Sequence, residues 1–307
     1  MKNNFINYCL FFFLFFTSCQ FNNYETIDKN IRFRQQIKTG EFLKLSKGFT
    51  YYEIKNKEAK NTLIFIHGFS VPSYIWDDTF KSACKKGYKS VRLDLYGRGY
   101  SSNLDSDYTD ELFANQVIEL MNELKIERAT FLGLSNGGRV ISKIAYLKPE
   151  LIQKLVYVSS SSFQEHKPIN DTSVSGKEIN DFIKNNYPSI SKGQMLDFKY
   201  PQKFKGWDDK YEQLLQYEGF ARALISTRKN HVNLDLENKF INDSNIPLYT
   251  VWGDSDSAVV YNNFKNKLNK LMPRRIEYFI SNSGHLPNME NSVEFEDILY
   301  NKILKEN

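Results

Sequence analysis

The fold of this chain is decided at Gly133-Leu134-Ser135-Asn136-Gly137-Gly138, where two sequence patterns meet. An apolar run at residues 129–133 predicts a buried strand, and a helical pattern begins directly after the glycines. A serine on a sharp strand-to-helix turn has a strained backbone, and glycines beside it avoid clashes. Such a turn lifts the hydroxyl clear of the sheet, next to the free N–H groups of a helix N-terminus. We therefore predict that Ser135 is a nucleophile.

Strand-like and helical segments alternate on both sides of this turn. Short apolar runs without strict alternation are typical of strands covered on both faces. Alternation of strands with helices predicts a parallel sheet with right-handed crossovers. We expect an α/β fold with a mostly parallel central sheet flanked by helices, and an antiparallel pair before it at residues 42–55. The predicted strands are 62–66, 90–95, 129–133, 154–158, 247–252 and 275–280, and the helices are 73–86, 110–125, 137–148, 260–271 and 292–304.

The alternation is interrupted once, between residues 159 and 246, where no convincing strand occurs. An insertion this long is seldom structureless, and it is usually functional. We expect a core formed by residues 41–159 and 246–307, with residues 160–245 as a helical cap over the carboxyl edge of the sheet. Most aromatic residues of the cap are expected to pack its interior, and a few to line an apolar pocket. They are Phe182, Tyr187, Phe198, Tyr200, Phe204, Trp207, Tyr211, Tyr217 and Phe220.

A serine nucleophile needs a base and an acid to orient that base. His285 follows the last predicted strand, so it belongs at the carboxyl edge where a site forms in this kind of sheet. The order serine, acid, histidine requires an acid between them. Asp254 and Asp256 both follow the strand at residues 247–252, and spacing alone does not choose between them. The remaining histidines, His67 at a strand end and His166 and His231 in the cap, have weaker claims.

These motifs together resemble the α/β-hydrolase fold family over residues 45–305, most closely its lidded esterases, lipases and C–C bond hydrolases. The resemblance lies in His67-Gly68-Phe69-Ser70, Asp94-Leu95-Tyr96-Gly97-Arg98-Gly99-Tyr100-Ser101, the Ser135 turn, Trp252-Gly253-Asp254-Ser255-Asp256 and Gly284-His285-Leu286-Pro287. It implies that Asp256 is the catalytic acid and Asp254 a turn residue. It also implies that the backbone N–H groups of Phe69 and Asn136 form the oxyanion hole, and that His67 holds the turn without acting as a base.

The resulting hypothesis is a serine hydrolase without a cofactor, in which Ser135, His285 and Asp256 cleave a small, ester-like and apolar substrate through an acyl-enzyme. Three alternatives remain open. The same triad can transfer the acyl group to an acceptor other than water, or it can break a C–C bond next to a carbonyl. The fold can also keep a pocket and lose turnover, which would leave a ligand-binding protein.

The N-terminus predicts export rather than a folded segment. Lys2 precedes an apolar run at residues 9–16, which is too short for the roughly 20 residues of a membrane-spanning helix. Thr17 and Ser18 are small residues of the kind found at a signal cleavage site, and Cys19 follows. This arrangement resembles a bacterial lipoprotein signal. It implies a signal peptide at 1–18, lipidation of Cys19, a tether at 19–40, and a membrane-anchored protein of the periplasm or cell surface.

Composition excludes several other classes. The 307 residues are 41% hydrophobic and 25% charged, which is the balance of a globular protein and not of a disordered one. The net charge of +5 is weak for this length, and no run of five lysines or arginines occurs, so nucleic acid is not an expected partner. The three cysteines form no Cys-x-x-Cys pair and the four histidines are far apart, so no metal site is predicted.

Overall fold

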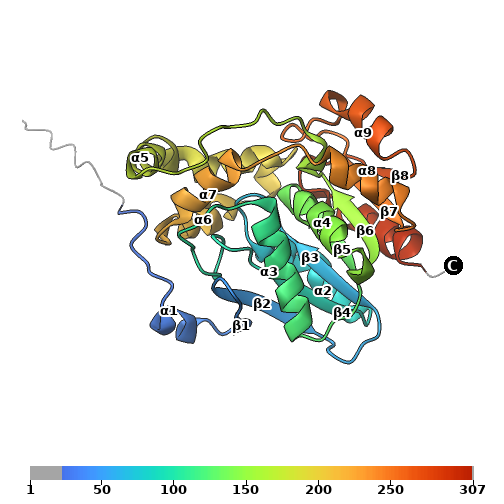
Figure 1. Ribbon diagram of the computed structural model, residues 1–307, viewed down its shortest axis with the longest axis horizontal. Coiled ribbons are helices and arrows are strands. Elements are labelled where there is room, and N and C mark those ends of the chain that lie inside the picture. Colours follow the sequence, from blue (N-terminus) through green and yellow to red (C-terminus); the bar gives the residue numbers. More distant parts are fainter. Residues whose placement is uncertain (1–22, 306–307) are drawn as a thin grey trace, which may run out of the picture.

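The computed structural model describes residues 23–305 and has a single eight-stranded sheet at its centre (Figure 1). The strand order is β1-β2-β4-β3-β5-β6-β7-β8; β1 and β2 run antiparallel to their neighbours and the other strands are parallel. This confirms the expected α/β fold with its leading antiparallel pair. The strands are β1 (Glu41–Lys44), β2 (Phe49–Lys55), β3 (Thr62–Ile66), β4 (Lys89–Leu93), β5 (Ala129–Leu134), β6 (Ile152–Val158), β7 (Leu248–Gly253) and β8 (Ile276–Ile280).

Helices cover both faces of the sheet, and Figure 1 shows α5, α6 and α7 gathered at one end of it. None of the helices between residues 23 and 305 combines the length and the apolar character that crossing a bilayer requires. The helices are α1 (Ile31–Gln36), α2 (Asp77–Lys85), α3 (Asp110–Glu123), α4 (Asn136–Leu147), α5 (Gly176–Gly193), α6 (Trp207–Glu212), α7 (Phe220–Lys229), α8 (Asp235–Asp243), α9 (Lys265–Leu271), α10 (Pro287–Glu290) and α11 (Ser292–Asp297), the last continued by a π-helical turn at Ile298–Ile303.

The core has two halves because successive side chains of a strand point to opposite faces. In β3, Ile64 and Ile66 pack under α3 and α4, whereas Leu63 and Phe65 pack on the other side with α2 and the C-terminal helices. All five residues of β3 are buried, which explains the continuous apolar run in the sequence. The second half of the core continues into the cap, where Tyr187 and Tyr211 are fully buried.

The last helix of the segment expected as a cap belongs to the core layer instead. Glu237 of α8 forms a 2.5 Å ion pair with Lys143 of α4, and the side chain of Asn238 accepts a hydrogen bond from Ser142 at 3.0 Å. Helix α8 therefore flanks the sheet beside α4, and the part of the insertion that covers the strand ends finishes before it. No change in the hydrophobic pattern marks the end of the cap before α8. The boundary predicted from the sequence, at residue 245, is therefore too late.

The N-terminal segment, expected as part of a tether, is packed against the domain from residue 24 onward. The Glu25 carboxylate accepts hydrogen bonds from the Tyr187 hydroxyl at 2.5 Å and from the N–H groups of Gly219 and Ala221 at 2.7 and 2.6 Å. The buried ammonium of Lys29 donates to the carbonyls of Gly99 and Ser101. The segment thus joins the start of α7 in the cap to a loop of the core.

Candidate active site

Ser135 lies at the junction of β5 and α4, as the glycine-rich turn predicts. Its backbone has φ 52° and ψ −115°, a conformation that residues other than glycine rarely adopt. The strain is held by the Ser135 N–H, which donates to Val158 at 2.8 Å, and by close packing around the glycines. A Cβ on Gly133 would lie 2.6 Å from the carbonyl oxygen of Gly137, and one on Gly137 would collide with Ile66. Only glycine therefore permits this turn, which leaves the serine side chain partly accessible among buried neighbours.

His285 and Asp256 come from the loops after β8 and β7 and are joined by a 2.8 Å contact between Nδ1 and Oδ2. The other oxygen of Asp256 accepts the N–H groups of Ala258 and Val259 at 2.9 and 2.8 Å, which fixes the carboxylate. Because a carboxylate only accepts hydrogen bonds, Nδ1 carries the proton and Nε2 is the nitrogen available to take another.

The carboxylate beside His285 changes its proton affinity. Burial of the imidazole disfavours the charged form, but the attraction of Asp256 outweighs burial and raises the pKa of His285 to about 9. The carboxylate of Asp197 acts in the same direction. Asp254, the alternative acid, faces away and binds the backbone N–H groups of Asn282 and Ser283 at 3.0 and 3.2 Å. Asp254 therefore holds the turn at residues 282–283, and the carboxylate that meets His285 is that of Asp256.

Ser135 and His285 line the same cavity of about 450 Å³, at the carboxyl ends of β3, β5, β7 and β8. No hydrogen bond joins their side chains in the structure, and contacts between nucleophile and base commonly tighten only in the complex with substrate. Cap residues form the far wall. The lining comprises Gly68, Phe69, Ser70, Val71, Ile75, Leu134, Ser135, Asn136, Ser161, Gln164, Gln194, Asp197, Arg228, His231, Ala258, Val259, His285 and Leu286.

The loop at residues 67–69 brings the second expected N–H donor to the cavity. A Cβ on Gly68 would lie 3.9 Å from the Ser135 hydroxyl, so the backbone that leads to Phe69 passes close to the nucleophile. His67 is fully buried; its Nε2 accepts the Leu95 N–H at 2.9 Å, so Nδ1 donates to the Gly68 carbonyl. Burial lowers its pKa to about 3, and the neutral ring braces the loop without acting as a base.

Arg98, for which the sequence predicted no role, is hydrogen-bonded to the same loop. Its Nε donates to the carbonyl of Phe69 at 2.8 Å, and its Nη2 donates to Thr227 of α7 at 2.8 Å. The side chain is 1% exposed, and burial lowers its pKa to about 10, so it remains a cation. Arg98 therefore ties the cavity wall at Phe69 to the cap.

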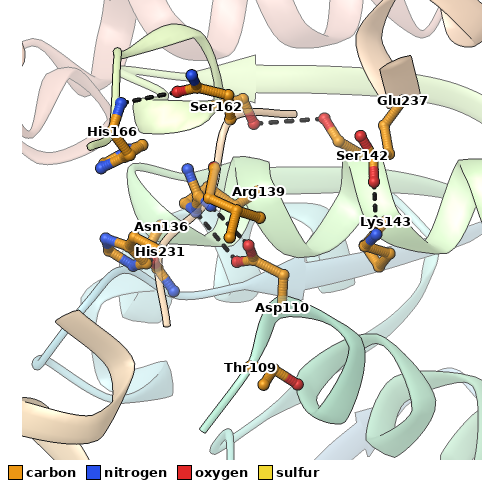
Figure 2. Close-up of polar contacts among 12 residues, drawn as sticks. Thr109, Asp110, Asn136, Arg139, Ser142, Lys143, Ser162, His166, His231 and Glu237 are labelled. Atoms are coloured by element: carbon orange, nitrogen blue, oxygen red, sulfur yellow. Dashed lines mark hydrogen bonds and ion pairs between the residues drawn. The ribbon is translucent and has the colours of Figure 1, made fainter. Parts of the chain in front are cut away.

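A buried polar network reaches Asn136 from the cap (Figure 2). The Nε2 of His231 lies 2.8 Å from the side-chain oxygen of Asn136. Burial, followed by the charge of Arg139, lowers the pKa of His231 to about 2, so the ring is neutral and donates to the amide oxygen. Arg139 makes two bonds to Asp110, at 3.0 and 2.6 Å, and a third to the carbonyl of Val232 at 2.7 Å. This ion pair anchors the chain that carries His231 to α3 and α4.

The structure brings together the five residues predicted at the site, which are Ser135, His285, Asp256, Phe69 and Asn136. Cys19 lies outside the described residues. The structure differs from the prediction in the character of the cavity. Of the nine cap aromatic residues, most were expected to pack the interior and a few to line an apolar pocket. All but Tyr200 pack in the core that the cap shares with the sheet, and none of the nine lines this cavity. Polar cap residues line it instead, namely Gln164, Gln194, Asp197, Arg228 and His231. No motif marks them, since they reach the cavity only through the path of the cap.

Comparison with known proteins agrees with this architecture. An uncharacterised hydrolase of Bacillus subtilis (strain 168) is 25% identical over 250 residues, which cover 77% of this chain and 87% of that protein. A thermophilic esterase from Thermogutta terrifontis has a TM-score of 0.70 at 16% identity, over 85% of this chain and 97% of that one. A bromoperoxidase from Bacillus anthracis has a TM-score of 0.72 at 17% identity, over 87% and 100%.

These structural likenesses establish the fold alone, because identity is low. The family is established by the sequence of residues 61–236, which matches the model described as the alpha/beta hydrolase fold. This match covers more than half of the chain and includes the Ser135 turn and the Phe69 loop. The chain belongs to the α/β-hydrolase fold family.

Proposed function

We propose that the protein is a serine hydrolase that cleaves a carboxylic ester through an acyl-enzyme. The observation that carries this proposal is the His285–Asp256 contact of 2.8 Å at the cavity that also contains Ser135. A serine hydroxyl is a weak nucleophile until a base removes its proton. The strained turn presents that hydroxyl, and the adjacent imidazole has its second nitrogen available as the base.

In the proposed reaction, Ser135 attacks the ester carbonyl while Nε2 of His285 takes the hydroxyl proton. The imidazolium then gives this proton to the departing alcohol, and the Asp256 carboxylate stabilises it throughout. A water molecule, activated by the same imidazole, attacks the acyl-enzyme and releases the acid. Water gives hydrolysis, whereas another acceptor in its place gives acyl transfer.

The negative charge on the carbonyl oxygen is received by the N–H groups of Phe69 and Asn136. Asn136 is the first residue of α4, and the first N–H groups of a helix have no partner within the helix. Phe69 follows Gly68, whose backbone lies beside the Ser135 hydroxyl. Each such donor typically contributes about 3 kcal/mol to the stability of the transition state.

The test uses p-nitrophenyl butyrate and a fluorophosphonate probe on purified protein. Wild type should hydrolyse the ester and be labelled at Ser135, whereas Ser135→Ala should lose labelling and at least about a thousandfold in kcat. Ser257→Ala, an exposed serine in the loop of Asp256, is the matched control. Equal rates for wild type and Ser135→Ala would reject the mechanism. A folded wild type that the probe does not label would favour a ligand-binding protein, and product analysis with added alcohols separates hydrolysis from acyl transfer.

We also propose that the protein is exported and held at a membrane by lipid on Cys19. The support is the sequence alone: Lys2, the apolar run at residues 9–16, and the small residues Thr17 and Ser18 directly before the cysteine. Mass spectrometry of the mature N-terminus should find an acylated Cys19. Cys19→Ala should move the protein from the membrane to the soluble fraction, and unchanged membrane association would reject the anchor.

A further inference from the structure

Two charged cap residues of opposite sign line the active-site cavity. Asp197 ends the short 3-10 helix Gln194–Asp197, and Arg228 lies in the last turn of α7. No ion pair joins Asp197 to Arg228 in the described part of the chain. Each side chain therefore brings its own charge to the cavity. Such an arrangement gives the cavity an electrical polarity, and the reaction geometry determines which part of an ester meets which charge.

Asp197 lies on the side of His285. Its backbone carbonyl accepts the His285 N–H at 2.7 Å, and its carboxyl raises the proton affinity of that imidazole. In the proposed mechanism His285 gives its proton to the departing alcohol, so the alcohol part of an ester must lie next to this imidazole. The alcohol part therefore also lies beside Asp197, where a second negative charge would be repelled.

Arg228 lies on the side of Phe69. The carbon at the centre of its guanidinium is 5.8 Å from the centre of the Phe69 ring, and the buried Arg98 approaches the same ring at 5.5 Å. Phe69 follows Gly68, whose backbone passes close to Ser135, so Arg228 lies on the Phe69 wall of the cavity. An acyl chain that is bound at Ser135 with its oxygen at the Phe69 N–H meets Arg228 when it extends along this wall.

The guanidinium of Arg228 differs from the neighbouring cations of α7 in having no carboxylate partner among the residues that the structure describes. Lys229 pairs with Glu178 at 2.6 Å and Arg222 pairs with Asp105 at 2.8 Å. No ion pair in residues 23–305 includes Arg228, and its guanidinium lies beside the ring of Phe69. Arg228 is exposed, and an arginine beside an aromatic ring at the edge of a cavity presents a planar fork that matches a carboxylate.

We propose that the enzyme is selective for esters whose acyl part carries a carboxylate, which Arg228 binds, and whose alcohol part is neutral or cationic because of Asp197. This inference rests on the proposed function, since that function assigns the two halves of the ester to the two walls. It names a class, the monoesters of short dicarboxylic acids, in place of the apolar substrate expected from the sequence.

The first experiment compares kcat/KM for three esters. Monomethyl glutarate carries the anion on the acyl part, methyl pentanoate is neutral and of similar length, and O-butyrylglycolate carries the anion on the alcohol part. Wild type should prefer monomethyl glutarate over methyl pentanoate about tenfold, as expected for a charge-assisted pair at a partly exposed site. O-butyrylglycolate should be the poorest substrate, and raising the salt concentration should reduce the preference.

Variants separate the two charges. Arg228→Gln should bring the ratio of kcat/KM for monomethyl glutarate to that for methyl pentanoate close to one. Arg222→Gln, which removes the same charge from α7 away from the cavity, should leave the ratio unchanged.

Asp197→Asn should raise the rate on O-butyrylglycolate relative to ethyl butyrate by several-fold. A ratio that Arg228→Gln does not alter overturns the inference, even when Ser135-dependent hydrolysis is intact.

A binding arm keeps the inference testable if the protein hydrolyses none of these esters. Monomethyl glutarate is titrated by calorimetry into Ser135→Ala and into Ser135→Ala combined with Arg228→Gln. If Ser135→Ala binds monomethyl glutarate and the double variant does not, the carboxylate subsite is supported. If wild type also hydrolyses no ester, that result rejects the proposed function and leaves the subsite standing. Equal binding by both variants, or none by either, overturns the subsite.

Discussion

The imidazole Nε2 of His231 lies 2.8 Å from the side-chain oxygen of Asn136, the residue that follows Ser135. A histidine of the cap is thereby joined to the residue whose backbone N–H is expected to stabilise the oxyanion. The cap is consequently more than a cover over the cavity, because one of its side chains supports the first turn of α4.

This contact predicts that His231 affects turnover. His231→Ala should lower kcat for p-nitrophenyl butyrate about fivefold, because a hydrogen bond of this kind is worth about 1 kcal/mol and its loss leaves Asn136 less firmly held. His231→Gln should recover much of the loss, since its amide can donate to the same oxygen. An unchanged kcat in His231→Ala would show that the contact is irrelevant to the reaction.

The ion pair of Arg139 and Asp110 should dominate the stability of this region. Its side chains are 0% and 4% exposed, so Asp110→Asn leaves a buried guanidinium without its counter-charge. We expect a loss of about 3–5 kcal/mol in the free energy of unfolding, measured with urea. Asp181→Asn breaks the Lys177–Asp181 pair, which is 85% and 54% exposed, and should leave the free energy of unfolding nearly unchanged. Similar losses for both variants would contradict the role of burial.

The raised pKa of His285 predicts the pH dependence of the reaction. The imidazole acts as a base only when neutral, so kcat/KM should rise as the pH increases through the pKa of His285, with a midpoint above the ordinary 6.5 and towards 9. Asp256→Asn removes the carboxylate that favours the imidazolium, and its residual activity should have a midpoint at lower pH. The initial rates of both proteins between pH 5 and 10 provide the check, and coincident midpoints would refute the assignment.

Gly133 should be intolerant of a side chain. Its Cβ would lie 2.6 Å from the carbonyl oxygen of Gly137, and both atoms belong to the backbone of the Ser135 turn, so neither can move cheaply. Gly133→Ala should lower the melting temperature by several degrees and reduce labelling of Ser135 by the fluorophosphonate probe. Gly176→Ala, in α5 with nothing near its Cβ, should be neutral or slightly stabilising. A stable and fully labelled Gly133→Ala would disprove the steric argument.

Several features of the site could be predicted because they depend on local chemistry. The glycines around Ser135 are required by a backbone conformation, and the buried strands are apparent as apolar runs, since both faces of the sheet are covered. The position of His285 after the last strand follows from topology, because the carboxyl ends of parallel strands share one edge. The choice between Asp254 and Asp256 could not be made from spacing, since it depends on which way each carboxylate faces.

The amino-acid sequence by itself determined the α/β architecture and the turn that carries Ser135, because periodic burial and glycine geometry are properties of short segments. Only the tertiary structure decided which side chains of the cap meet the cavity. Asp197, Arg228 and His231 are separated from Ser135 by long stretches of chain, and no local pattern records where a helical insertion folds back. Their proximity results from packing of the cap on the sheet, which is a property of the whole molecule.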